Sequence, residues 1–176
     1  LTYQLGDAPS PLLLAVVQTI GQGNPFFAHE LVNAMRQAGK IIKEDDVWQI
    51  SSELVHLLQR ADYVTQVDGT WLLKPNVDLS TVKLGLPDSI HGLVLAHLDR
   101  LPESHKLTLK VSSVLGYYID LVLVKDVHPE EKDVAQIEAE AAYMEAEEVV
   151  HQEMPDRKIY AFRQQTTQEV AYQTLL

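Results

Sequence analysis

Several short clusters hold residue types that could do chemistry at a suitable spacing. His29 and Glu30 begin the zinc-protease string H-E-x-x-H, in which two histidines four residues apart bind a metal from one helix face. Asn33 occupies the position of the second histidine. The sequence also contains no cysteine, which excludes thiolate ligands. We therefore predict no metal site.

Two pairs of neighbours could combine a nucleophile with a base: Ser89 with His91, and Ser104 with His105. On a helix, however, residues one or two positions apart point in different directions. The Glu-rich stretch over residues 133–148 is expected to keep most of its carboxylates in water, with no acid and base held opposite each other. We predict no catalytic residue.

Two glycines precede the helix start at Asn24 and Pro25, but not in the pattern of a phosphate-binding loop. The phosphate-binding string G-x-x-x-x-G-K-[ST] is absent, and Gly23 is followed by Asn24 and Pro25. The chain alone is therefore not expected to bind a triphosphate.

The charge of the chain argues against nucleic acid as a partner. It carries 14 basic and 25 acidic side chains, a net charge of -11, and ten of the acids fall between Asp126 and Glu153 beside only Lys132. Such a face repels phosphate backbones. The sequence has no signal peptide and no apolar run long enough to span a membrane. We therefore expect no membrane partner and a cytoplasmic location.

The elements that must position these residues are mainly helical. Ser10-Pro11 and Asn24-Pro25 each start a helix, which Gly21 and Gly39 end. A third helix is predicted over residues 46–61, and Asp68-Gly69 predicts a hairpin between residues 63–67 and 70–73.

Residues 74–85 show no periodicity and are interpreted as a linker between two small domains. Beyond it, helices are predicted after Pro87 and Pro102, then a short apolar segment over 119–124, a helix over 133–148, and a hairpin of residues 149–152 and 159–162. A capping box at Thr166 predicts a last helix. Three helices followed by a hairpin are typical of a winged helix.

Three sets of residues, in this order and spacing, resemble the region that follows the P-loop core in signal-transduction ATPases of the STAND class, which are AAA+-like. They are 23–31 (GNPFFAHEL), then 86–90 (LPDSI) with 98–102 (LDRLP), then 160–163 (YAFR) with 168–172 (QEVAY). The resemblance is greatest to bacterial multidomain proteins that join a class III adenylate/guanylate cyclase to an ATPase and tetratricopeptide-type repeats.

The resemblance implies roles for both halves of the chain. In this family the first part is the helical lid of the ATPase, and a G-x-P motif places its proline against the adenine. That role would fall to Pro25, with Gly23 and Asn24 shaping the turn. An Asn-Pro start would leave free helix amides at a positive dipole end, while the proline ring offers a flat apolar surface to a base. The alternative is an ordinary helix start. The second part resembles the winged-helix domain that packs on the ATPase core and helps to hold the nucleotide-bound resting state.

Two positions depart from the family pattern. The string near the end usually reads F-R-H, and Gln164 stands where the histidine would be, so the phosphate contact known in some relatives is not carried over. His97 stands where the family usually has arginine. These departures indicate a diverged member with weaker charge contacts to the core or the nucleotide.

We therefore predict a mainly α chain with a helical lid subdomain and a short β-hairpin over residues 1–80, and a C-terminally truncated winged-helix domain over 81–176. The chain lacks an initiator Met and stops inside a helical run, so we expect a piece of a longer protein. The expected function is non-catalytic: sensing of ATP or ADP and relay of that state between domains. ATP or ADP would bind in the full-length parent and not to this piece alone.

The partners implied by the resemblance are an upstream P-loop ATPase core and downstream helical repeats of the same polypeptide. Two other functions stay open from the sequence. A winged helix is also a common DNA reader in transcriptional regulators, although the acidic charge disfavours it here. The chain could instead be a structural module for protein contacts, with Phe26, Phe27 and Trp71 simply in the core.

Overall fold

The structure is a computed structural model of the 176-residue chain, and it describes residues 7–79, 85–87 and 89–175. The described chain is 54% helical, with eight helices and three small sheets that include hairpins, and its class is α/β. The predominance of helix agrees with the prediction. The two-stranded sheet and two strands of the second unit's sheet are the predicted hairpins, whereas the three-stranded sheet of the first unit was not predicted.

The chain divides into two compact units, Leu1–Leu93 and Val94–Leu176. The division falls inside α5, which spans Ile90–Leu98, and the domain boundary near residue 80 stays a prediction. Part of the predicted linker, residues 80–84, lies outside the described residues, as does Asp88 of the LPDSI string. Among the described residues, no helix has the length and apolar character needed to cross a membrane.

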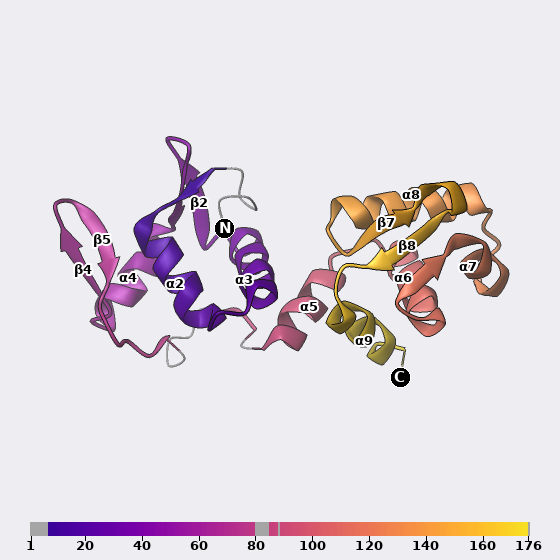
Figure 1. Cartoon of the computed structure of the whole chain (residues 1–176). Helices are drawn as coiled ribbons and strands as arrows, with labels where there is room; N and C mark the ends of the chain where they lie inside the picture. Colours follow the sequence, from indigo (N-terminus) through magenta and orange to yellow (C-terminus); the bar gives the residue numbers. More distant parts are fainter. Residues whose placement is uncertain (1–6, 80–84, 88, 176) are drawn as a thin grey trace. The chain divides into compact units, whose positions relative to one another are not determined.

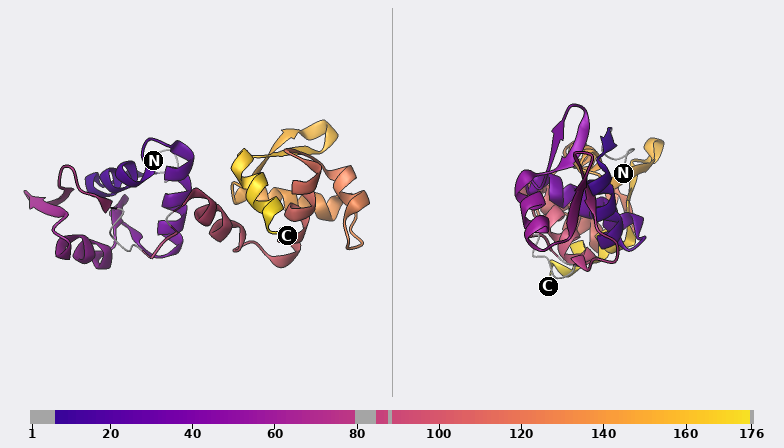
Figure 2. Two further views of the ribbon diagram at one scale, coloured as in Figure 1. Left: turned by 90° about the horizontal axis from the view of Figure 1, so that it is seen from below. Right: turned by 90° about the vertical axis from the view of Figure 1, so that its left-hand side faces the viewer.

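The first unit begins with two helices that meet at a corner and pack against each other (Figure 1; Figure 2). The Ser10 side chain caps the first of them, accepting from the Leu13 amide at 3.3 Å. A three-stranded sheet has the order β1-β3-β2, with β1 parallel to β3, and a two-stranded sheet follows. The elements are β1 (Ala8–Pro9), α2 (Pro11–Gly21), α3 (Pro25–Gln37), β2 (Ile41–Glu44), β3 (Val47–Ile50), α4 (Ser52–Arg60), β4 (Val64–Val67) and β5 (Thr70–Leu73).

The helix predicted over residues 46–61 is wrong in its first part. Val47–Ile50 forms β3, and α4 begins only after Ser51, whose side chain accepts from the Leu54 amide. Asp45 and Asp46 both have positive φ, of 48° and 59°, and form the two-residue turn of a hairpin with β2. Aspartate tolerates this left-handed conformation, so the two aspartates favour a turn. The helical spacing of the apolar residues that follow led to the wrong prediction of a helix from residue 46.

The one hairpin predicted in this unit is confirmed. Val67 pairs with Thr70 across Asp68 and Gly69, whose φ angles are 48° and 80°. These angles suit a type I′ turn, which matches the twist of the flanking strands.

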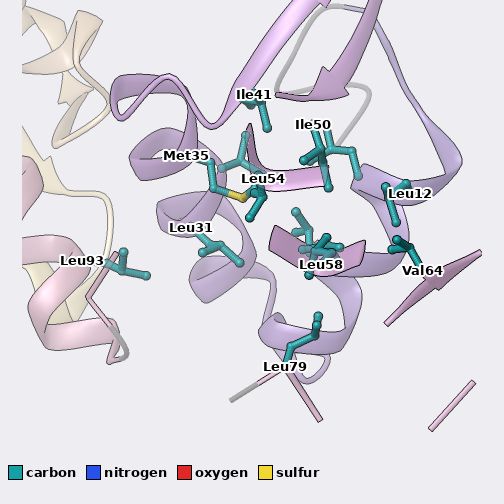
Figure 3. Close-up of a cluster of buried hydrophobic side chains, with 14 residues drawn as sticks. Leu12, Leu31, Met35, Ile41, Ile50, Leu54, Leu58, Val64, Leu79 and Leu93 are labelled. Atoms are coloured by element: carbon teal, nitrogen blue, oxygen red, sulfur yellow. The ribbon is translucent and has the colours of Figure 1, made fainter. Parts of the chain in front are cut away.

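Aliphatic side chains from all parts of the first unit form one core. In Figure 3, side chains from α2, α3 and α4 and from the strands point toward one another. Trp71 and Phe27 are half-buried and pack on the edge of this core. The most deeply buried large members are Leu13, Val16, Leu31, Met35 and Leu58.

The second unit places a three-stranded antiparallel sheet against its helices (Figure 1). The strand order is β6-β8-β7, so the first strand in sequence pairs with the last. The elements after α5 are α6 (Glu103–Leu115), β6 (Tyr118–Asp120), α7 (Leu121–Val127), α8 (Val134–Ala146), β7 (Val150–Met154), a 3-10 turn (Pro155–Arg157), β8 (Ile159–Phe162) and α9 (Gln165–Gln173).

Two local predictions in this unit need correction. The apolar segment over 119–124 divides into strand β6 and helix α7, because the Asp120 carboxylate accepts from the amides of Val122 and Leu123 and starts a helix there. The capping box predicted at Thr166 is also wrong: the N-cap of α9 is Gln164, two residues earlier, and it makes no side-chain cap. A true capping box starts α8, where Asp133 and Gln136 bond each other's amides at 2.8 and 2.9 Å.

Phe162 is fully buried on β8, and we predict that its replacement measures how much the second unit depends on this sheet. Phe162→Ala should lower the free energy of unfolding of that unit by about 3–5 kcal/mol, because it removes apolar burial and leaves a cavity. Tyr118→Ala, at an exposed aromatic on β6, should change it by no more than about 0.5 kcal/mol. Urea unfolding followed by circular dichroism measures both; equal effects would contradict this role of Phe162.

Candidate functional site

The corner that holds Gly23, Asn24 and Pro25 joins α2 to α3. Gln22 adopts a left-handed conformation at φ 47°, and Gly23 follows at φ 78°. The Asn24 amide donates to the Gly21 carbonyl at 2.8 Å, which closes the turn. The structure therefore brings the three predicted residues together at one rigid bend between two packed helices.

The amides at the start of α3 are already bonded, contrary to the prediction that they are free. The Asn24 side-chain oxygen accepts from the amides of Phe26 and Phe27 at 3.0 and 3.1 Å. The Ala28 amide donates to the Asn24 carbonyl at 3.0 Å, and Pro25 has no amide hydrogen. The first turn of α3 therefore has no amide left to bind a phosphate.

What the corner does offer is an exposed apolar ring. Gly23, Asn24 and Pro25 are all exposed, while Phe27 turns inward onto the core of the first unit. The sequence contains no lysine or arginine between Leu12 and Met35, so the corner brings no cation of its own. Its geometry suits contact with a flat uncharged surface, such as a nucleobase, and not with a charged group.

The H-E-x-x-N segment on α3 is structural. The Asn33 side-chain nitrogen lies 3.0 Å from His29 Nε2, so the asparagine bonds to the histidine that it would have joined as a ligand. Glu30 is buried, with a carboxylate oxygen 4.0 Å from the same ring nitrogen. Within the described residues no group of three His, Cys, Asp or Glu side chains could hold a metal ion.

One prediction about the serine and histidine neighbours is wrong. Ser104 Oγ lies 3.1 Å from His105 Nδ1, so these side chains do meet, and the His105 ring packs edge-on against Tyr143 at 4.7 Å. Ser104 also hydrogen-bonds to the Glu140 carboxylate. In a catalytic triad the carboxylate instead bonds to the histidine ring and orients it as a base, whereas here the carboxylate bonds to the serine. The Ser89 side chain accepts from the Gly92 amide at 3.1 Å and so caps the start of α5.

A buried polar cluster that the sequence did not predict connects α6 to α8. Thr108 donates to one oxygen of Glu140, and Lys132 donates to the other at 2.9 Å and to the Thr108 hydroxyl at 3.3 Å. The Lys132 and Glu140 side chains are only 10% and 12% exposed. An ion pair with so little water depends on these extra hydrogen bonds to offset its desolvation.

His128 completes this polar cluster from the loop before α8. The backbone N–H of Glu130 donates to Nδ1 at 3.1 Å, which leaves Nε2 to donate to the Thr108 hydroxyl at 3.0 Å. Thr108 thus accepts two hydrogen bonds and donates one. The cluster ties the loop over 128–133 to two helices at a single buried hydroxyl.

The pKa of Glu140 reflects this environment. Burial raises the pKa of the carboxyl, but hydrogen bonds from Thr108, Lys132 and Ser104 and the charge of Lys132 outweigh burial and hold the pKa below its usual value. The sequence carried a signal for this: Glu140 lies three residues after Ile137 and four before Met144, both buried, and so belongs to the inward face of α8. The cluster holds the fold together and has no group poised for reaction.

Comparison of the chain with protein-family models, with curated proteins and with solved structures found no match in any of the three.

The Asn24 cap can be tested directly, because it holds the corner that carries the candidate site. Asn24→Ala should lower the free energy of unfolding of the first unit by about 1 kcal/mol, since two amides lose their acceptor. Asn24→Asp keeps the accepting oxygen and should retain most of the stability. Denaturant titration of the three proteins checks this, and an unchanged Asn24→Ala variant would show that the cap is not needed.

The lowered pKa of Glu140 predicts a pH dependence with a definite sign. A carboxyl with a depressed folded pKa stabilises the fold above its unfolded pKa, near about 4.3, and this contribution disappears as the pH falls through the folded value. Glu140→Gln should therefore destabilise the chain near neutral pH, and the difference from wild type should shrink toward about pH 3.

The measurement is urea unfolding of wild type and Glu140→Gln across this pH range. Glu147→Gln is the matched control, because it removes a carboxylate from the exposed end of the same helix without touching the cluster. A constant difference between wild type and Glu140→Gln at every pH would contradict the prediction.

Proposed function

We propose that this chain is a non-catalytic regulatory module of a STAND-class, AAA+-like signalling ATPase, in which it helps to sense ATP or ADP. In this proposal the first unit is the lid and the second is a winged-helix domain. An upstream P-loop core of the longer protein would hold the triphosphate. The proposal also includes a class III nucleotidyl cyclase attached to that longer protein. The chain itself transfers no group.

The observation that carries the proposal is the exposed Pro25 ring on a corner whose amides are already used. A lid that faces only the base needs an apolar wall and no phosphate donors, because the core supplies those. The rigid turn at Gly23 and the Asn24 cap fix the direction of the ring before nucleotide binds. This preorganisation reduces the entropy lost on binding.

The layout of the second unit supports its assignment as a winged helix. Its elements follow the order helix, strand, helix, helix, strand, strand from α6 to β8, and the β7–β8 hairpin forms the wing around Pro155–Arg157. The first strand pairs with the last, which closes the three helices onto the sheet. His97, at the family's arginine position, is buried on α5, and Gln164 is exposed at the start of α9.

The surface of α8 disfavours the DNA-binding alternative. In a winged helix this helix would enter the major groove, where Arg, Lys, Asn and Gln read the bases. The helix contains no lysine or arginine. Its exposed residues are mostly alanines with Tyr143 and Gln136, and the Gln136 side chain is bonded to the Asp133 amide in the capping box. Lys158 beside the wing is already paired with Glu138 at 2.6 Å.

The test uses the longer protein in which the chain follows a P-loop core. Pro25→Ala should weaken binding of ADP by about fivefold, a loss of roughly 1 kcal/mol, because the base loses an apolar contact. Pro11→Ala is the matched control, since Pro11 also is exposed at the first position of a helix, α2. Isothermal titration with ADP measures both. Equal affinity of wild type and Pro25→Ala would favour the structural module instead.

A further inference from the structure

An apolar surface covers α7 and the strand that leads into it. The helix has seven residues, of which Leu121 and Val124 are buried. Val122, Leu123 and Val127 face outward with 48–55% of their area exposed, and Tyr118 of β6 is 61% exposed. We call these four exposed residues the β6–α7 surface.

The concentration of exposed apolar side chains in this segment is unusual. Of thirteen large hydrophobics that are exposed among the described residues, six lie within residues 114–127. Single exposed hydrophobics are ordinary, whereas a cluster marks a surface that binds something. The outer face of α4 shows the ordinary pattern, with Glu53, His56 and Gln59 toward water. On α7 the exposed aliphatic residues Val122, Leu123 and Val127 outnumber the exposed Lys125 and Asp126, unlike the polar outer face of an ordinary surface helix.

An open hollow of about 500 Å³ lies at the end of α7. Glu130, Glu131 and Asp133 contribute carboxylates to its lining, and Lys125 and Lys132 contribute ammonium groups. Lys132 is paired with Glu130 and Glu140, and Lys125 with Asp126. Together with Glu131 and Asp133, five carboxylates therefore accompany the two lysines. The hollow therefore presents a net negative, concave rim beside the β6–α7 surface.

This charge decides between the candidate occupants. A second copy of the chain would bring its own Asp126, Glu130 and Glu131 against the same residues, and like charges facing each other oppose association. An anionic lipid surface is disfavoured for the same reason. An apolar segment edged with cations matches both features: its stripe covers the exposed aliphatic side chains and its cations approach the hollow.

We propose that the β6–α7 surface docks an amphipathic helix of a protein partner, with Leu, Ile or Val along one stripe and Lys or Arg at its edge. In recognition of this kind, apolar anchors of the helix bind and charges select the partner. The proposal goes beyond the nucleotide role, because it depends on no residue of the corner around Pro25.

The experiment is a selection from a displayed library of helical peptides whose stripe is aliphatic and whose edge positions vary among Lys, Arg, Glu and Ser. The bait is the full chain, and the counter-selection uses Leu123→Ser/Val127→Ser, whose exposed positions tolerate polar residues. Peptides retained by wild type should favour Lys and Arg over Glu at the edge by at least about tenfold, which corresponds to roughly 1.4 kcal/mol.

Three variants test the assignment with the best selected peptide in fluorescence anisotropy. Leu123→Ser/Val127→Ser should weaken binding at least about tenfold, whereas Val67→Ser, at an exposed valine of β4, should leave it unchanged. Glu130→Gln/Glu131→Gln should weaken binding and flatten its salt dependence, because the hollow loses two of its carboxylates. Glu147→Gln is the charge control. Circular dichroism establishes that each variant is folded.

The proposal fails if no peptide is enriched, if peptides with Glu or Ser edges are retained as well, or if wild type and Leu123→Ser/Val127→Ser bind equally. It also fails if Leu123→Ser/Val127→Ser abolishes self-association in ultracentrifugation, or binding to vesicles of phosphatidylcholine and phosphatidylserine, since the occupant would then be a second copy or a membrane. No nucleotide takes part, so these results are independent of the ADP measurement.

Discussion

The amides at the start of each helix are the constraint on which much of this structure depends. A helix leaves its first amides without internal partners, and short polar side chains supply the missing acceptors here. Ser10, Asn24, Ser51, Asp120 and Asp133 do this for α2, α3, α4, α7 and α8. Each cap sets where its helix begins and therefore which side chains face the core.

The same constraint shapes the candidate site. At Asn24 the cap that creates the corner also consumes the amides that could have bound a phosphate. The corner is left with a proline ring held at a fixed angle to α2 and α3. A nucleotide site that used this corner would need its phosphate donors on another part of the protein, as the proposed P-loop core provides. Under the proposed function, the helix cap thus leaves this corner only contact with the base.

The second unit departs from the usual pattern of apolar inside and polar outside in two places. Glu140 and Lys132 are buried together with Thr108, while Val122 and Leu123 face water on the helix next to them. Departures of this kind are found where a protein binds or transmits something, because stability alone would remove them. The buried ion pair is fully satisfied and fixes the geometry of α6, α8 and the loop between α7 and α8. The exposed aliphatic residues have no such compensation within the described chain, which is why we assign them to a partner.

The sequence by itself determined the elements with strong local signals: the capped starts of α2 and α3 and the hairpin across Asp68 and Gly69. It also brought Gly23, Asn24 and Pro25 together, since adjacent residues need no tertiary contact to meet. Only the tertiary structure decided the rest. The strand Val47–Ile50 forms because it pairs with β2, and Glu140 is buried because Lys132 and Thr108, from outside its helix, surround it. Strand pairing and side-chain burial depend on residues that are distant in sequence. A local sequence pattern does not indicate which distant residues will lie next to a given strand or side chain.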